Sequence, residues 1–356
     1  MANKEKRSRG PMLPVHGASV LPSVIVDAYN CELEDEDGFV GDKASKSAFH
    51  EILDRIRKAS EEDPFGKKAS EEIRKKKLGE VLTEGNAEAA AIVQSAIEDF
   101  AQQLAAVIKR FLRLKAWHDT DCIVIGGGFR SGRVGELAIA RAALLLREDD
   151  VTLDLEPIHS DPDEAGLIGA AHLLPPWMLN GHEGMLAMDV GGSNIRTGII
   201  EFNLDKAMDL SKARVFEMKL WRHKEEEPSR DDAVEYLIDM LSSLAKEAKK
   251  ADVSLVPIIG IGCPGLIEQD GSITRGAENL PGNWESKKFN LPALICEALP
   301  SIGEHQTMVV MHNDAVVQGL SELPHLDGYK HWGVLTIGTG LGNARFSRAP
   351  KKNRKP

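Results

Sequence analysis

Residues 188–198 read Met-Asp-Val-Gly-Gly-Ser-Asn-Ile-Arg-Thr-Gly, and this stretch decides the fold. An apolar run ends at Asp189-Val190, two glycines follow, and a second apolar run resumes at 196–202, which predicts a β-hairpin. Glycines let backbone amides approach a ligand closely. A carboxylate at a strand end can hold Mg²⁺, usually through water. The hairpin therefore predicts a site for the phosphates of a nucleotide and for its metal ion.

Three other glycine-rich turns follow apolar runs, at 126–128, 262–265 and 338–342. Ligands gather at such strand ends in α/β proteins, and Gly338-Thr339-Gly340 would add a second phosphate cradle with one hydroxyl. Helices are expected near 86–114, 133–146, 165–173 and 231–249, and strands near 122–125, 151–155, 185–190, 256–261, 308–311 and 333–337. This alternation predicts an α/β fold with parallel strands.

A second carboxylate stands in His312-Asn313-Asp314-Ala315, directly after an apolar strand. Transfer of a phosphoryl group to an alcohol needs a metal ligand and a base, which two separate acids can supply. Asp189 would serve the metal and Asp314 would serve as the base. A compatible structural role for Asp314 is the N-cap of the helix that follows.

Several of these stretches together resemble the ROK family (repressors, open reading frames and sugar kinases). They are DVGGSNIRTG at 189–198, GIGCPGLIEQDGSITRGAENLPGNW at 260–284, HNDA at 312–315, LTIGTGLG at 335–342, IVIGGG at 123–128 and AGLIGAAHL at 165–173. That family belongs to the actin-like ATPase superfamily, with hexokinases and heat-shock 70 chaperones. The resemblance implies a two-domain ribonuclease H-like, actin-type ATPase fold with an interdomain cleft. It also implies ATP- and Mg²⁺-dependent phosphorylation of a sugar hydroxyl, as in a hexose kinase similar to glucokinase.

The resemblance also implies a role for each matching residue. Asp189 would position Mg²⁺ through water, and Asp314 would take the proton from the attacking hydroxyl. The phosphates would be held by Gly191, Gly192, Ser193, Asn194, Gly338, Thr339 and Gly340, and adenosine would pack on Gly127 and Gly128. Sugar hydroxyls would be held by Asn279, Gly282, Asn313 and Asp314.

The order of the motifs differs from that of the family, in which the phosphate hairpin comes first and the adenosine turn last. Here Gly126–Gly128 precede Asp189, which predicts a circular permutation with the old ends joined through 175–184 and new ends opening near Asn343. The expected parts are an adenosine-side domain from 1–176 and 321–347, a domain with the hairpin and sugar site at 183–320, and a basic tail at 348–356. A fusion of two half-proteins is the alternative, but each motif occurs once.

Permutation also places the two ends of the chain near one another. The segment from Ala344 to Pro356 carries six basic residues and no acid, which indicates a solvated terminus. The stretch 58–77 is dense in Lys and Glu and is expected to form an exposed helix–turn–helix excursion.

Two family features are missing from the sequence. The Glu-x-Gly-His sugar contact and the cysteine-rich zinc site would fall near the N-terminus, where His16-Gly17 is the nearest fragment. A lone histidine is more often structural than a ligand. The four cysteines are Cys31, Cys122, Cys263 and Cys296, and they form no CxxC, so no structural zinc is predicted. Cys122 and Cys263 lie in apolar runs and are expected to be core thiols. Asn-Leu-Pro-Gly-Asn-Trp, which ends at Trp284, is one residue longer than the usual motif.

Composition limits the function classes. The chain has 356 residues, 42% hydrophobic and 28% charged, which suits one large or two medium globular domains. Its net charge of −11 disfavours nucleic-acid binding. No apolar run reaches the length of a membrane span, and the N-terminus lacks the apolar core of a signal peptide. We therefore expect a cytoplasmic protein with a small-molecule partner, and the sequence leaves a homodimer open.

Three other functions compete with a sugar kinase. One is a non-catalytic regulatory protein of the same fold that senses a sugar or a nucleotide. Another is a dinucleotide site at 122–133, but Ser131 replaces the third glycine of GxGxxG and acidic Asp154 stands 26 residues after Gly128. A chaperone or cytoskeletal role is disfavoured because NLPG and HNDA are features of a sugar site.

Overall fold

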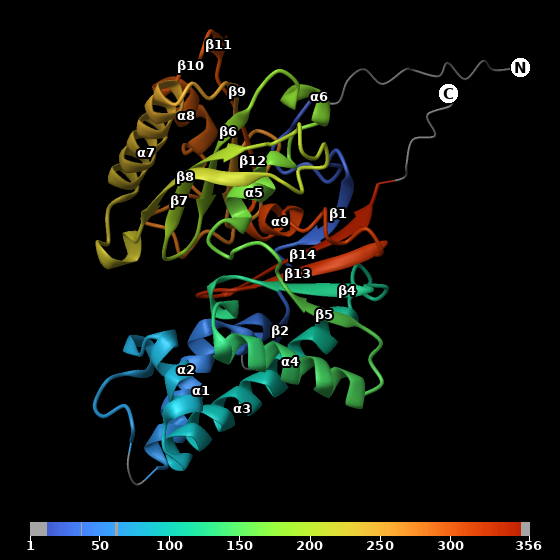
Figure 1. The fold of residues 1–356 in the computed structure, drawn as a ribbon, viewed down its shortest axis with the longest axis vertical. Helices are drawn as coiled ribbons and strands as arrows, with labels where there is room; N and C mark the ends of the chain where they lie inside the picture. The colour runs from blue at the N-terminus through green and yellow to red at the C-terminus, as the bar shows by residue number, and fades with distance from the viewer. Residues whose placement is uncertain (1–12, 37, 61–62, 350–356) are drawn as a thin grey trace, which may run out of the picture.

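The computed structural model describes residues 13–36, 38–60 and 63–349, and two five-stranded sheets form its frame (Figure 1). The first sheet has the order β1 (Val24–Tyr29), β14 (Leu341–Arg348), β13 (His331–Ile337), β4 (Cys122–Gly126) and β5 (Asp154–Pro157). The second has the order β12 (Met308–Asn313), β9 (Leu255–Cys263), β6 (Gly184–Val190), β7 (Ile195–Glu201) and β8 (Arg214–Trp221). Two small hairpins pair β2 (Glu34–Asp35) with β3 (Gly38–Phe39) and β10 (Ser301–Ile302) with β11 (His305–Gln306).

The two sheets follow one plan. In the second sheet β6, β7 and β8 form an antiparallel meander, and β9 and β12 run parallel to β6. In the first sheet β13, β14 and β1 form the meander, and β4 and β5 run parallel to β13. In the second sheet the meander β6-β7-β8 comes before β9 and β12 along the chain. The first sheet would follow the same order, meander first and then β4 and β5, only if β13 and β14 came before β1 in the sequence.

Helices cover and separate the sheets in layers (Figure 1). The outer face of the first sheet carries α1 (Lys46–Lys58), α2 (Lys75–Glu84), α3 (Ala87–Leu112) and α4 (Arg133–Glu148), and that of the second carries α7 (Arg230–Lys250) and α8 (Leu291–Ala298). Between the sheets lie α5 (Ala165–Ala171) and α9 (Asp314–Leu320), and the short α6 (Pro176–Leu179) precedes β6. This mixed α/β architecture of two sheets confirms the expected fold class.

Helix α3 shows how local sequence determines an element. The side chain of Asn86 accepts a hydrogen bond from Ala89 N at 2.8 Å and caps the helix. Phe100, Leu104 and Ile108 recur on the buried face and are completely buried against the first sheet and its helices. Burying each such side chain stabilises the fold by about 1.5–3 kcal/mol. The predicted α3 is therefore confirmed, with its start at the predicted cap.

The central helices touch backbone to backbone. A Cβ added at Gly169 of α5 would lie 1.8 Å from the carbonyl oxygen of Val317 in α9, so only glycine permits this approach. The two helices belong to one apolar cluster that also includes side chains from both sheets. Their contact therefore sets the distance between the sheets.

The expectation of a solvated C-terminus from Ala344 onward was wrong for residues 344–348. They belong to β14, the strand that joins β13 to β1. Arg345 is 4% exposed and its guanidinium forms ion pairs with Asp27 and Asp119. The error arose because both carboxylates are more than 200 residues away along the chain. Residues 350–356, which make up most of the predicted tail, lie outside the described residues.

The charged stretch at 58–77 also differs from the expected helix–turn–helix. Arg57, at the end of α1, is buried and donates hydrogen bonds to Asp63 at 2.8 Å and to the carbonyl of Lys68 at 2.6 Å. These bonds fasten Asp63 and Lys68 to α1, and the part of the connection to α2 that the structure describes contains the short turn Ser70–Glu72. Smaller differences concern β5, which begins three residues later than expected, and α1 and β1, which the sequence analysis did not predict.

The segment before β1 and the segment after β14 lie side by side, because Ala349 N donates to Ser23 O at 3.2 Å. The proximity of the tails themselves falls outside the described residues. Among the described helices, none combines the length and apolarity needed to cross a membrane.

We predict opposite effects for two glycine-to-alanine changes. Gly169→Ala should lower the free energy of unfolding by about 1–3 kcal/mol or more, because the added methyl meets a backbone atom that cannot turn away. Gly79→Ala in α2 should raise it by about 0.5–1 kcal/mol, since its Cβ would have an ordinary contact at 3.8 Å. Urea unfolding of both variants tests this, and equal stability of Gly169→Ala and the wild type would contradict the helix contact.

Candidate functional site

A cleft of about 470 Å³ lies where strand ends from both sheets meet. Its lining includes three glycine turns: 127–128 after β4, 191–193 between β6 and β7, and 338–342 between β13 and β14. The hydroxyl oxygens of Ser193 and Thr339 are 2.9 Å apart, so the two hairpins face one another directly. Asn194 also lines the cleft. The prediction that these turns share one cleft is confirmed.

The turn after β4 is held by the central layer of helices. Gly127 has φ of 80°, and a Cβ there would lie 2.5 Å from the carbonyl oxygen of Ile337, so the turn packs on the end of β13. Its N–H donates to Oε1 of Gln318 in α9 at 2.9 Å. Gln318 was not predicted as a site residue, although its amide is a lone polar group within the apolar run of α9.

Asp189 stands near the end of β6, where it is 6% exposed. A Cβ on Gly166 of α5 would lie 2.5 Å from Cγ of Asp189, so this helix packs directly on the carboxylate. A guanidinium nitrogen of Arg196, the cross-strand partner, is 3.6 Å from Oδ2. Burial raises the pKa of Asp189, Arg196 opposes this rise, and Asp163 adds to it. The carboxylate is thus only partly compensated by the protein.

Asn313, not Asp314, caps α9. Its Oδ1 accepts hydrogen bonds from Ala315 N at 3.0 Å and Val316 N at 3.3 Å, while its Nδ2 donates to Gly265 O at 3.1 Å. The alternative role of Asp314 as an N-cap is therefore wrong. Asp314 occupies the first turn of α9 with its half-buried side chain on the cleft.

The environment of Asp314 suits proton transfer near neutral pH. Burial raises the pKa of Asp314 to about 7, and the charge of Asp189 adds to the rise, while hydrogen bonds at the start of α9 oppose it. A base is most effective when its pKa lies near the operating pH. Two neighbouring acids of unequal environment can therefore divide the roles of base and metal ligand.

The predicted sugar-binding residues are only partly brought together. Asn279 lines the cleft with Asp314. Gly282 does not line it: this residue has φ of 71°, and a Cβ there would lie 2.8 Å from Cβ of Arg230, so it serves a turn beside α7. The amide of Asn313 is buried and fully used within the protein, as described above. For Gly282 and Asn313 the structure therefore supports positioning roles rather than direct contact with a sugar.

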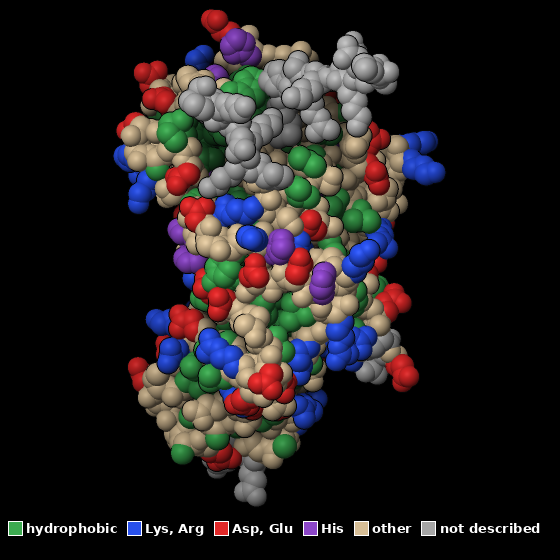
Figure 2. Space-filling model, turned by 90° about the vertical axis from the view of Figure 1, so that its right-hand side faces the viewer, with side chains coloured by type: hydrophobic (Ala, Val, Ile, Leu, Met, Phe, Trp, Pro, Cys, Tyr) green, Lys and Arg blue, Asp and Glu red, His purple; other side chains and the backbone are tan. Residues whose placement is uncertain are grey.

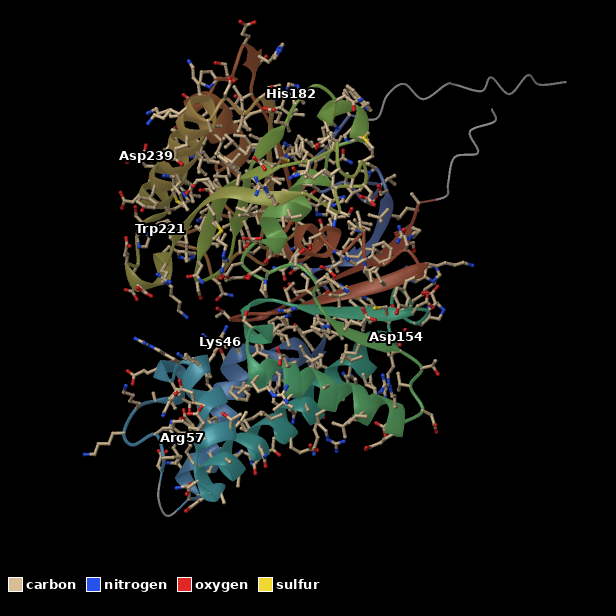
Figure 3. All side chains as sticks on the ribbon, in the orientation of Figure 1. Lys46, Arg57, Asp154, His182, Trp221 and Asp239 are labelled. Carbon is tan, nitrogen blue, oxygen red and sulfur yellow. The ribbon has the colours of Figure 1, made fainter. Side chains whose placement is uncertain are left out.

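Basic side chains on the cleft were missed by the sequence analysis. In the described part of the chain, the lining contains Lys46, Lys75, Arg196 and Arg222. In Figure 3, Lys46 at the start of α1 lies on the side of the first sheet's helices that faces the second sheet, whose strand β8 ends at Trp221. On the face shown in Figure 2, basic and acidic side chains intermingle. The cleft lining therefore combines these four cations with the carboxylates of Asp163, Asp189 and Asp314. A ligand that brings both a phosphate chain and a metal ion would suit such a mixed lining.

The donor set fits Mg²⁺ better than zinc. Carboxylate oxygens of Asp189, buried and incompletely compensated, are the hard ligands that Mg²⁺ prefers. No group of three or more His, Cys, Asp or Glu in the described residues is arranged to hold a metal by itself. The absence of a structural zinc stays a prediction.

His16, Cys122 and Cys263 do not line the cleft and have structural roles. His16 accepts a hydrogen bond from Met311 N at 3.0 Å through Nδ1 and thereby fastens the N-terminal segment to β12. Cys122 and Cys263 are completely buried, as expected of core thiols. The structural interpretation of these residues is confirmed.

Comparison with solved structures finds similarity over about half of this chain. A ROK hexokinase from Thermus thermophilus is 24% identical with a TM-score of 0.33, covering 45% of each chain. The Lmo2764 protein of Listeria monocytogenes is 23% identical with a TM-score of 0.33, covering 48% of this chain and 51% of that one. An exopolyphosphatase from Cytophaga hutchinsonii is 19% identical with a TM-score of 0.22, covering 53% and 56%. This chain therefore spans about half the length of these structures. No family model and no curated protein matches the sequence.

We predict that Asp314 makes stability depend on pH. Because its folded pKa of about 7 exceeds the ordinary 3.8, it contributes stability that is present below about pH 4 and lost as the pH rises through about 7. Asp314→Asn removes this titration. Its stability relative to the wild type should therefore be greater at pH 8 than at pH 5 by roughly 2 kcal/mol.

Urea unfolding in buffer with a chelator measures this difference. The exposed Asp239→Asn on α7 is the matched control, labelled in Figure 3, and its effect should be the same at both pH values. An Asp314→Asn effect that does not change with pH would show that the carboxyl titrates normally.

Proposed function

We propose that the protein is an ATP-dependent sugar kinase of the ROK type that phosphorylates a hydroxyl of a hexose. The observation that carries this proposal is the joint placement of Asp314, Asp189 and three glycine turns on one cleft. A binding protein needs the turns but has no need of a carboxylate whose pKa is raised to about 7. The sequence motifs at these positions, which resemble those of ROK kinases, support the same function.

In the proposed mechanism the two acids and the two glycine turns have separate roles in phosphoryl transfer. Asp314 accepts the proton of the sugar hydroxyl as its oxygen attacks the γ-phosphorus, and ADP leaves on the opposite side. The N–H groups of Gly191 and Gly338 donate to Asn194 O and Gly340 O within their own turns. The amides of Gly192, Thr339 and Gly340 would therefore orient the phosphates, with the Ser193 and Thr339 hydroxyls between them. Asp189 would hold Mg²⁺ through water, and this ion, when bound, neutralises charge on the phosphate oxygens.

The adenosine would lie beyond Gly127 and Gly128, where a second cavity of about 400 Å³ opens. Its lining combines apolar side chains such as Phe49, Ile73 and Leu78 with the ring of Phe129. A planar base is accommodated by such surfaces. Phe129, which directly follows the Gly127–Gly128 turn, lines both this cavity and the cleft.

We also propose that the chain is a circular permutant with the domain division 1–176 with 321–347, and 183–320. The strand orders support it, because the first sheet repeats the plan of the second only when β13 and β14 precede β1. The hydrogen bond between Ala349 N and Ser23 O also supports it, because a short connection between these two segments would close this order. Helices α9 and α5 then each follow the last parallel strand of a sheet, β12 and β5.

A sensor that binds a sugar without turnover is the second candidate. It is favoured by one observation: Gly282 and Asn313, expected on the sugar, do not line the cleft. The family's Glu-x-Gly-His contact is also absent from the sequence. Binding of a sugar by calorimetry, without release of ADP, would select the sensor.

We predict that release of ADP, measured by a coupled assay over a panel of hexoses, requires both a sugar and Mg²⁺. Asp314→Asn should lower kcat by about 10²–10⁴-fold while changing sugar affinity modestly, because asparagine keeps the shape but not the basicity. Asp189→Asn should instead weaken the dependence on Mg²⁺. Undiminished kcat in Asp314→Asn would remove this residue from the mechanism.

A further inference from the structure

The reaction cleft and the side cavity share a wall. Lys46, Lys75 and Phe129 line both spaces. A ligand that occupied both cavities would pass between these three side chains. The two lysines come from helices that the cleft motifs do not include, α1 and α2.

Both lysines are fixed at helix starts that contact the glycine turns. Ser45 caps α1 by accepting a hydrogen bond from Ala48 N at 3.1 Å, and Lys46 N donates to Gly338 O at 2.9 Å. Lys75 opens α2, and its ammonium group donates to the carbonyl of Gly128. Each lysine is therefore anchored beside a turn assigned to the nucleotide, one on the phosphate side and one on the adenosine side.

The charges at this junction are unbalanced. Desolvation lowers the pKa of Lys75, and the nearby Lys46 and Arg196 lower it further, while Asp163 alone opposes them. Asp163 is also bound to Arg196. Arg196 is also compensated by the approach of Asp189, whereas Lys75 has only Asp163 to raise its pKa. Lys46 and Lys75 therefore repel each other, and an anion placed between them relieves that repulsion.

We propose that Lys46 and Lys75 form a clamp on the phosphate chain of the phosphoryl donor where it passes from the reaction cleft to the side cavity. The proposal rests on the proposed function and adds residues that the motif resemblance does not assign. Lys75 exchanges the carbonyl of Gly128 for a phosphate oxygen when the donor binds. The donor is taken to be a nucleoside triphosphate, because a bare phosphate chain would leave the adjoining side cavity unused. That cavity is lined by Phe49, Ile73 and Leu78 together with charged side chains.

A purely structural latch makes a different prediction. If Lys75 only fastens α2 to Gly128, its removal should lower the free energy of unfolding. It should not change the affinity for a phosphate ligand or the dependence of that affinity on salt. Lys76 is the matched control, since this neighbour is 88% exposed on the same helix, with its nearest carboxylate oxygen, of Glu80, at 4.0 Å. Its substitution should alter neither stability nor binding.

The test is calorimetric binding of ADP and of a non-hydrolysable ATP analogue to the full chain, so it does not depend on turnover. Lys75→Gln and Lys46→Gln should each weaken binding by about 10- to 100-fold, as expected for loss of a charged hydrogen bond. The affinity of the wild type should fall with added salt more steeply than that of either variant. Thermal unfolding of each variant checks that it is folded.

Binding of inorganic triphosphate distinguishes a nucleotide donor from a bare polyphosphate donor. It should bind more weakly than the ATP analogue but with the same sensitivity to Lys75→Gln, because it reaches the clamp and not the side cavity. Equal affinity for both ligands would overturn the choice of a nucleotide. Binding by Lys75→Gln and Lys46→Gln equal to that by Lys76→Gln would overturn the clamp. Nucleotide binding that depends on the lysines in a protein without kinase activity would keep the clamp and reject the proposed reaction.

Discussion

The backbone contact between α5 and α9 is the constraint on which the site depends. Gly169 lets the carbonyl of Val317 approach to a distance that any side chain would block. From this pair of helices, Gly166 packs on Asp189, Asp314 begins α9, and Gln318 holds the amide of Gly127. The metal-side acid, the base and the adenosine-side turn are therefore positioned by one central layer, although they belong to different sheets.

The central helices α5 and α9 also determine the electrostatic environment of Asp189 and Asp314. Helix α9 points its first turn at the cleft, and α5 closes the space behind Asp189, so both acids lose water while remaining near one another. Their mutual repulsion and their burial favour the protonated form of Asp314. The basic side chains stand on the walls of the cleft rather than beside Asp314, apart from the approach of Arg196 to Asp189. Asp314 can therefore accept a proton, while Asp189 lies beside the guanidinium of Arg196.

Local sequence patterns predicted those parts of the fold whose partners are near in the chain. The hairpin at Asp189, the cap at Asn86 and the periodic face of α3 each depend on neighbours within a few residues or one turn of helix. Glycine turns marked the ends of β6 and β13 correctly. The fold class and the meeting of the three turns could thus be inferred from motifs and strand order.

The remaining features depend on contacts between distant segments. Arg345 is buried because Asp27 and Asp119 meet it from the far end of the chain, and a basic residue with distant partners resembles a solvated one in sequence. Asn313 is chemically able to bind a sugar, and only the path of α9 and the position of Gly265 show that its amide is used. Lys75 is exposed, as the alternating charges around it suggest, and only the position of α2 shows that its ammonium group reaches the carbonyl of Gly128.

The central claim is that one nucleotide occupies a site built from three separate turns. Hydrogen–deuterium exchange with and without a Mg²⁺-bound, non-hydrolysable ATP analogue tests it most directly, because each turn reports through its own backbone amides. The account predicts slower exchange at 127–128, 191–193 and 338–342 together, with little change in the distant α8. Protection confined to a single turn, or its absence from 127–128, would contradict a shared site.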